Sequence, residues 1–259
     1  MPLVETTLTE SIGTLTLAHD ERRNALGNAL IDELLQGLAA FEKDRARAVI
    51  LRARPGAHVF SAGHDIAELP RGAADPLAYD DALERLLRAV KHFPAPVIAM
   101  VHGSVWGGAC DLVLSCDLVV GDPSCSFAIT PANLGLPYNV TGILQLMSRV
   151  PLHVAKEMFF TAAPVPAEAA HHWGILNHLV PEAELEGLSY ELARTIASKA
   201  PLSVAVMKEQ FQILTSSRPM APDTFDRIQD HRRRVYQSSD YLEGIRAFEE
   251  KRKPVFRGE

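Results

Sequence analysis

Two short stretches combine glycine with polar side chains where an apolar run ends. Residues 60–66 read Phe-Ser-Ala-Gly-His-Asp-Ile, and residues 103–109 read Gly-Ser-Val-Trp-Gly-Gly-Ala. Glycine lets backbone N–H groups approach a ligand closely, and a helix that begins just after Gly108 adds the positive end of its dipole. One N–H group from each stretch could form an oxyanion hole, which stabilises negative charge on a carbonyl oxygen. Short glycine turns are common, so a purely structural reading stays open.

Three further side chains could do chemistry, and each also has a structural reading. Asp111 stands three residues after Gly108, where a carboxylate also interacts favourably with a helix dipole. Tyr138 could be an ordinary packed aromatic with a hydroxyl partner. His64 could serve only through its backbone N–H. The His171-His172 pair matches no metal-ligand spacing, and we assign it no function.

Alternating strands and helices are predicted to position these stretches. Apolar side chains at helical spacing predict a helix over 28–43, capped by Asn28, and another over about 77–92. Strands are expected at 48–53, 97–101 and 118–120, and a short helix at about 109–115. Strands that alternate with helices indicate an α/β fold with crossover units and a mostly parallel sheet.

The chain is predicted to be nearly all helical beyond Pro151. The expected segments are 152–161, 166–173, 182–198 and 201–214. A last helix is expected to begin at a capping box of Asp240 and Glu243 and to run toward Arg252. The basic run 232–234 lies beside acidic residues and indicates a solvated helix face.

Composition excludes several classes of protein. The 259 residues carry a formal net charge of −6, which argues against a nucleic-acid partner. No apolar run approaches the roughly 20 residues that cross a bilayer, so we expect no membrane partner and a cytoplasmic enzyme. The cysteines number three and lack metal-ligand spacing, as expected for small buried residues in a reducing compartment.

The two glycine stretches, together with residues 239–254, resemble the signature segments of the crotonase (enoyl-CoA hydratase/isomerase) superfamily. The resemblance covers essentially the whole chain. It implies a crotonase-like spiral of ββα units over residues 1–198, which hold the active site, and a helical C-terminal oligomerisation segment over 199–259. It further implies an acyl-CoA substrate and a homotrimer, or a hexamer built as a dimer of trimers.

The resemblance also implies roles for particular residues. The backbone N–H groups of His64 and Gly108 would form the oxyanion hole. Coenzyme A would lie along Ala62, Gly63, His64, Asp65 and Ile66, with Thr130 near the acyl group and Lys251 near the phosphates, helped by Arg22 and Arg23. The basic cluster around Lys251 is equally typical of a helix C-terminus. The family chemistry needs no metal, no biotin and no other cofactor, because coenzyme A is part of the substrate.

The chain departs from the hydratases of this superfamily, which resemble one another in using two glutamates to handle water. Here the first position holds Asp111 and the second falls on Pro131, which cannot act as an acid or a base. Residues 130–139 instead resemble the methylmalonyl-CoA decarboxylases, a family that releases CO₂ without biotin. That resemblance implies that Tyr138 holds the substrate carboxylate. An enoyl-CoA hydratase or isomerase that uses Asp111, or a catalytically decayed oligomer that binds CoA esters, remain the alternatives.

Overall fold

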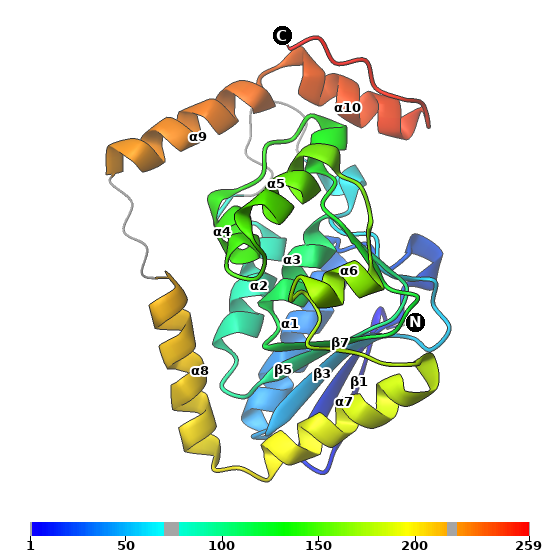
Figure 1. Ribbon diagram of the computed structural model, residues 1–259, viewed down its shortest axis with the longest axis vertical. Coiled ribbons are helices and arrows are strands. Elements are labelled where there is room, and N and C mark those ends of the chain that lie inside the picture. Colours follow the sequence, from blue (N-terminus) through cyan, green and yellow to red (C-terminus); the bar gives the residue numbers. More distant parts are fainter. Residues whose placement is uncertain (1, 70–77, 217–221, 259) are drawn as a thin grey trace.

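A six-stranded sheet forms the centre of the computed structural model, which describes residues 2–69, 78–216 and 222–258 (Figure 1). The strands of this large sheet lie in the order β1 (Val4–Thr9), β2 (Ile12–Leu17), β3 (Ala48–Ala53), β5 (Val97–Val101), β7 (Leu118–Gly121) and β10 (His178–Leu179). β1 pairs antiparallel with β2, and every later pair is parallel. This confirms the predicted, mostly parallel sheet.

A second, four-stranded sheet contains β4 (Val59–Ser61), β6 (Ser104–Trp106), β8 (Ser126–Ala128) and β9 (Val165–Pro166). The chain alternates between the two sheets, because β3 leads to β4, β5 to β6 and β7 to β8. Helix α2 (Ala82–His92) follows the first of these pairs, α3 (Gly108–Ser115) the second and α4 (Val140–Met147) the third. The fold is therefore the predicted spiral of ββα units.

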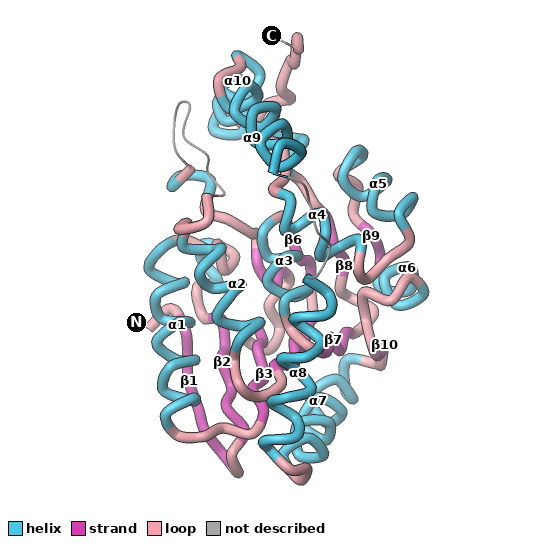
Figure 2. The backbone as a smooth tube through the Cα atoms, turned by 90° about the vertical axis from the view of Figure 1, so that its left-hand side faces the viewer, coloured by secondary structure: helices cyan, strands magenta, loops and turns pink. Residues whose placement is uncertain are grey.

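Both faces of the large sheet are covered by helices (Figure 2). Val49 and Leu51 of β3 face the main core, which α1 (Asn28–Lys43), α2 and α3 complete. Ile50, between them, faces the opposite side and belongs to a smaller cluster with Leu185 of α7 (Glu182–Ala197). A strand that is buried on both faces is apolar throughout, which explains the continuous apolar runs at 48–53 and 97–101.

The capping residues of several helices differ from the prediction. Gly27, not Asn28, precedes α1 as its N-cap, and Asn28 instead donates two hydrogen bonds to Glu68 Oε2, each 2.8 Å long. Helix α2 begins at Ala82, where the Asp81 side chain accepts a hydrogen bond from the Leu83 N–H. The predicted start of that helix, residue 77, lies outside the described residues.

The C-terminal helices α8 (Pro201–Ser216), α9 (Pro222–Tyr236) and α10 (Ser239–Glu249) follow the edge and the top of the α/β body (Figure 1). Ser238, rather than the predicted Asp240, caps α10. Arg232, predicted to lie on a solvated face, is buried and donates a hydrogen bond of 2.7 Å to the Tyr236 hydroxyl.

Two contacts fasten these helices to the body. The buried Lys208 ammonium of α8 lies 2.7 Å from Asp117 and donates to two backbone carbonyl oxygens. Helix α10 packs on the 3-10 helix η3 (Pro131–Leu134) so closely that a Cβ on Gly244 would lie 2.3 Å from the Leu134 carbonyl oxygen.

The remaining helices are α5 (Leu152–Thr161) and α6 (Ala167–His172). No helix in the described ranges is long and apolar enough to cross a membrane.

Candidate active site

The two glycine stretches meet where strands β4 and β6 end. These strands pair in parallel, so their C-terminal ends lie side by side and the loops that follow them touch. Gly63 has a φ of +83°, and a Cβ added there would lie 2.3 Å from the Trp106 carbonyl oxygen and 3.1 Å from the Gly108 nitrogen. Only glycine fits this contact, since both the backbone angle and the space exclude a side chain.

The contact leaves two backbone N–H groups without an acceptor among the described residues. Gly108 is the first residue of α3, so its N–H has no partner within the helix. His64 forms a parallel bridge with Leu26 that uses the carbonyl of Gly63 and the N–H of Asp65. Within the described residues, neither the His64 N–H nor the Gly108 N–H donates a hydrogen bond. The loops thus present two close donors, an arrangement that suits an oxyanion.

The His64 ring is held by the beginning of α2. Its Nε2 atom lies 3.7 Å from Asp81 Oδ2, and its Nδ1 atom lies 3.2 Å from the Asp65 carbonyl oxygen. Burial acts to lower the imidazole pKa, but the hydrogen bond and the charge of Asp81 outweigh it, so the pKa of His64 is raised. These contacts fix the backbone of residue 64 and with it the direction of its N–H.

The buried Asp111 and the half-buried Tyr138 form a hydrogen-bonded pair beside these donors. Asp111 is 6% exposed in the first turn of α3, and its Oδ2 atom accepts a short hydrogen bond from the Tyr138 hydroxyl. Burial raises the pKa of Asp111 to about 7, helped by the nearby Glu84 and opposed by the Tyr138 hydrogen bond. Burial and the Asp111 charge also raise the pKa of Tyr138 well above its ordinary value. At neutral pH the Tyr138 hydroxyl therefore keeps its proton, and the Asp111 carboxyl is protonated more readily than an ordinary aspartate.

The position of Tyr138 is set by the start of α4 and by α5. Its ring lies over Gly142, where a Cβ would be 2.3 Å from Cε1, and its centroid is 5.0 Å from that of Phe159. The next residue, Asn139, caps α4 by accepting from the Gly142 N–H and donates a short hydrogen bond to Glu84. Glu84 and Asn139 were not among the predicted site residues, although an Asn before an apolar run is a recognisable N-cap signal.

Several residues expected to bind coenzyme A surround the same loops. Asp65 caps the 3-10 helix η2 (Ile66–Glu68) and pairs with Arg22 at 3.0 Å, whereas Ala62 is exposed and Ile66 is half-buried. Thr130 precedes η3, and its Oγ1 atom lies 3.4 Å from the position that a Cβ on Gly107 would take. Arg23 contributes its carbonyl, which accepts from the Ala62 N–H. The structure thus brings Arg22, Arg23 and Thr130 to the two loops.

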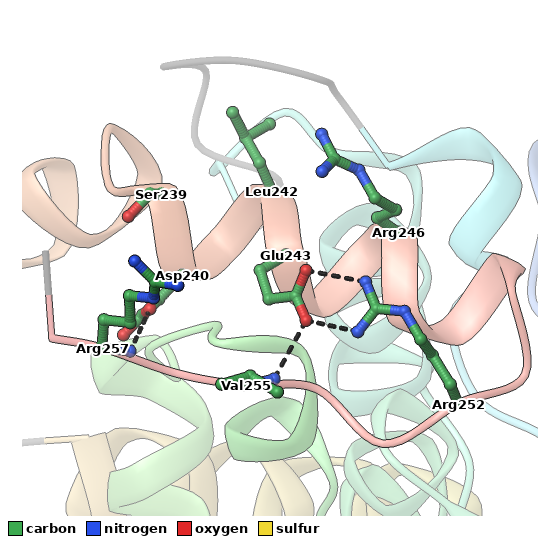
Figure 3. A pocket seen from close by; sticks show the side chains of 8 residues that line it. All are labelled: Ser239, Asp240, Leu242, Glu243, Arg246, Arg252, Val255 and Arg257. Carbon is green, nitrogen blue, oxygen red and sulfur yellow. Dashed lines mark hydrogen bonds and ion pairs between the residues drawn. The ribbon is translucent and has the colours of Figure 1, made fainter.

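Lys251 lies elsewhere, at the end of α10. It is exposed, and within the described residues its ammonium makes no hydrogen bond or ion pair. The chain then folds back along α10 and is held there by the two residues that were predicted to cap this helix. Glu243 accepts hydrogen bonds from Arg252 and from the Val255 N–H, and Asp240 accepts one from the Arg257 N–H (Figure 3). A cavity of about 460 Å³ lies between α10 and the segment that follows it.

The cysteines and histidines show no sign of metal binding in the described part of the chain. There, no group of three or more His, Cys, Asp or Glu side chains is placed to hold a metal ion. The cysteines are free and buried, and burial raises the pKa of each thiol. They are packed residues rather than nucleophiles.

Comparison with known proteins agrees with this architecture. The profile of the enoyl-CoA hydratase/isomerase family matches residues 7–259. The chain is 47% identical to a methylmalonyl-CoA decarboxylase of Escherichia coli K12 over 95% of each chain, and 32% identical to a carnitinyl-CoA dehydratase of Escherichia coli O157:H7 over 92% of each. A solved methylmalonyl-CoA decarboxylase in complex with 2-nitronate-propionyl-CoA superimposes with a TM-score of 0.97 at 45% identity, covering 99% of both chains. The chain belongs to the enoyl-CoA hydratase/isomerase family.

Proposed function

We propose that this protein is an enzyme that decarboxylates methylmalonyl-CoA, or a close malonyl-type CoA thioester, to propionyl-CoA and CO₂. The observation that carries the proposal is the 47% identity to a methylmalonyl-CoA decarboxylase over 95% of the chain. The site is compatible with it, because the loops offer two N–H donors while Pro131 stands where a second glutamate would be needed for water addition.

The thioester oxygen would lie between the His64 and Gly108 N–H groups. When the bond between the α-carbon and the carboxylate breaks, its electron pair moves into the thioester and the oxygen becomes negative. Donors that are already oriented stabilise that charge without reorganising, and losing one typically costs about 3–4 kcal/mol of barrier. Decarboxylation generates the enolate directly, so this route needs no base, no biotin and no metal ion.

Tyr138 would orient the group that leaves. A hydrogen bond from its hydroxyl to the substrate carboxylate would hold the breaking bond perpendicular to the thioester plane, where overlap with the forming enolate is greatest. Its supported position, between Gly142 and Phe159, favours such an orienting task.

Coenzyme A would lie along residues 62–66, with Thr130 beside the acyl group. Arg22 and the exposed Lys251 are the cations proposed for its phosphates, because a polyanion needs locally placed positive charge on a protein of net charge −6.

We further propose that residues 199–259 form the oligomerisation segment of a homotrimer, or of a dimer of trimers. Helix α8 exposes a series of large apolar side chains: Leu202, Val206, Met207, Phe211, Ile213 and Leu214. Apolar surface concentrated on one element is typical of a protein interface.

Phe211→Glu is expected to dissociate the oligomer, because Phe211 is 67% exposed on α8 and a charge at that position would have to be buried. Light scattering after size-exclusion chromatography would report a smaller mass for the variant at micromolar concentration. Gln210→Glu, a charge on the adjacent exposed position, is the control and should leave the mass unchanged. A wild-type monomer, or an unaltered mass in Phe211→Glu, would contradict the assignment.

The reaction can be tested by incubating the purified protein with methylmalonyl-CoA, malonyl-CoA and crotonyl-CoA and identifying the products by mass spectrometry. Propionyl-CoA from methylmalonyl-CoA is the expected result. Hydration of crotonyl-CoA alone would establish a hydratase, although the Asp111 carboxylate is already occupied by Tyr138. Tight binding without turnover would establish a decayed CoA-ester-binding oligomer.

A further inference from the structure

The Tyr138 hydroxyl has one proton, and in this structure it donates that proton to Asp111. The proposed reaction needs the same hydroxyl to donate to the substrate carboxylate. Both contacts can exist together only if Asp111 carries a proton of its own, which it can then donate to the Tyr138 oxygen. The geometry therefore connects the protonation of Asp111 to substrate binding.

The surroundings of Asp111 favour the protonated carboxyl. The side chain is buried at 6% exposure, and the charged groups that act on it are Glu84 and Lys91, both from α2. Burial disfavours the carboxylate, Glu84 adds negative charge, and the pKa of the half-buried Lys91 is itself lowered by burial. A bound substrate carboxylate would add further negative charge beside Tyr138.

Asp111 is also placed to act on the reacting atoms through Tyr138. It stands three residues after Gly108 on α3, so the two residues share one face of that helix. The N–H of Gly108 would hold the enolate oxygen, and the Asp111 carboxyl contacts the hydroxyl that would face the departing carboxylate.

We propose that Asp111 stores the proton that the reaction consumes and that Tyr138 delivers it to the α-carbon. This inference rests on the proposed decarboxylation. Loss of CO₂ leaves the enolate carbon where the carboxylate was attached. Tyr138 transfers its hydroxyl proton to that carbon, a C–H bond forms, and the Asp111 proton moves to the Tyr138 oxygen. Asp111 is left as a carboxylate and recovers a proton from solvent, so each turnover releases one CO₂ and takes up one proton.

We call the two proton transfers, from Asp111 to Tyr138 and from Tyr138 to the α-carbon, the proton relay. This relay gives the protein a second activity when it runs in reverse. With propionyl-CoA bound and Asp111 ionised, the Tyr138 proton moves to Asp111 while the phenolic oxygen takes a proton from the α-carbon. The resulting enolate is held by the oxyanion hole and is then reprotonated. In D₂O the α-hydrogens of propionyl-CoA should therefore exchange for deuterium without any CO₂ being present.

The test compares two rates in D₂O for the wild type and Asp111→Asn: CO₂ release from methylmalonyl-CoA, and deuterium uptake by propionyl-CoA followed by mass spectrometry. An asparagine can hydrogen bond to Tyr138 as the protonated carboxyl does, but it cannot supply a proton. Exchange is expected to fall by about 10²-fold or more, whereas formation of CO₂ in a single turnover should fall much less. Asp111→Glu restores a titratable carboxyl and should regain at least part of the exchange.

Asp122→Asn is a matched control, because Asp122 is also buried but its carboxylate, within the described residues, bonds only to Ser124 of the same turn. It should exchange at the wild-type rate. Exchange at the wild-type rate in Asp111→Asn would overturn the proposal, and so would a wild type that releases CO₂ but exchanges no α-hydrogen. Exchange without CO₂ release would instead support the relay and refute the proposed decarboxylation.

Discussion

Gly63→Ala is expected to lower kcat for CO₂ release by about 10²- to 10³-fold, the loss typical of a disrupted oxyanion hole. A methyl group at residue 63 would meet the Trp106 carbonyl oxygen at 2.3 Å and the Gly108 nitrogen at 3.1 Å. The two loops would have to separate, and the His64 and Gly108 donors would no longer converge on one oxygen. Steady-state CO₂ release from methylmalonyl-CoA measures the effect.

Gly56→Ala separates this effect from simple backbone strain. Gly56 also has a positive φ, +80°, but a Cβ there would meet nothing within 4 Å. Both variants should lose stability through the positive φ, on the order of 1–3 kcal/mol, and Gly63→Ala should lose more because its methyl group also meets the Trp106 carbonyl oxygen. Only Gly63→Ala should lose activity. Equal activity of the two variants at a temperature where both are folded would show that the loop contact does not form the site.

Tyr138→Phe is expected to lower kcat by about 10²-fold or more, because the phenyl ring keeps the packing but lacks the hydroxyl that we propose to orient the carboxylate and to transfer a proton. The contacts with Phe159 and Gly142 involve the ring and should persist. The rate of CO₂ release, measured together with KM, distinguishes lost chemistry from lost binding.

Tyr190→Phe is the matched control for this substitution. The Tyr190 hydroxyl lies 2.9 Å from Thr14 Oγ1, so the control also removes a partly buried hydroxyl that bonds a side chain. It lies on α7, which covers the other face of the large sheet. A kcat of Tyr138→Phe equal to that of the wild type would show that the Tyr138 hydroxyl takes no part in the reaction.

The strands of the large sheet and the longer helices were predictable because their apolar patterns are set by burial. The runs 48–53 and 97–101 are strands with those bounds, and 28–43 and 152–161 are helices with those bounds. The strands of the small sheet escaped the prediction, since β4, β6 and β8 have three residues each and show no period. The β1–β2 hairpin and α4 were also missed.

The site was predictable only in part, because its contacts depend on how elements pack. The glycine loops were evident in the sequence, and the structure places their N–H groups together. The bond between Tyr138 and Asp111 joins residues that are 27 positions apart, and it depends on how α4 lies against α3. Glu84 and Asn139, which support Tyr138, are 55 positions apart and gave no local signal of their contact.

The most direct test of the account is the rate at which the wild-type protein releases labelled CO₂ from carboxyl-labelled methylmalonyl-CoA, with avidin added to remove any contaminating biotin enzyme. We expect sustained turnover, unaffected by avidin, with one propionyl-CoA formed for each CO₂. No release of label above the spontaneous rate, with the protein folded and able to bind the thioester, would contradict the assignment of a decarboxylase.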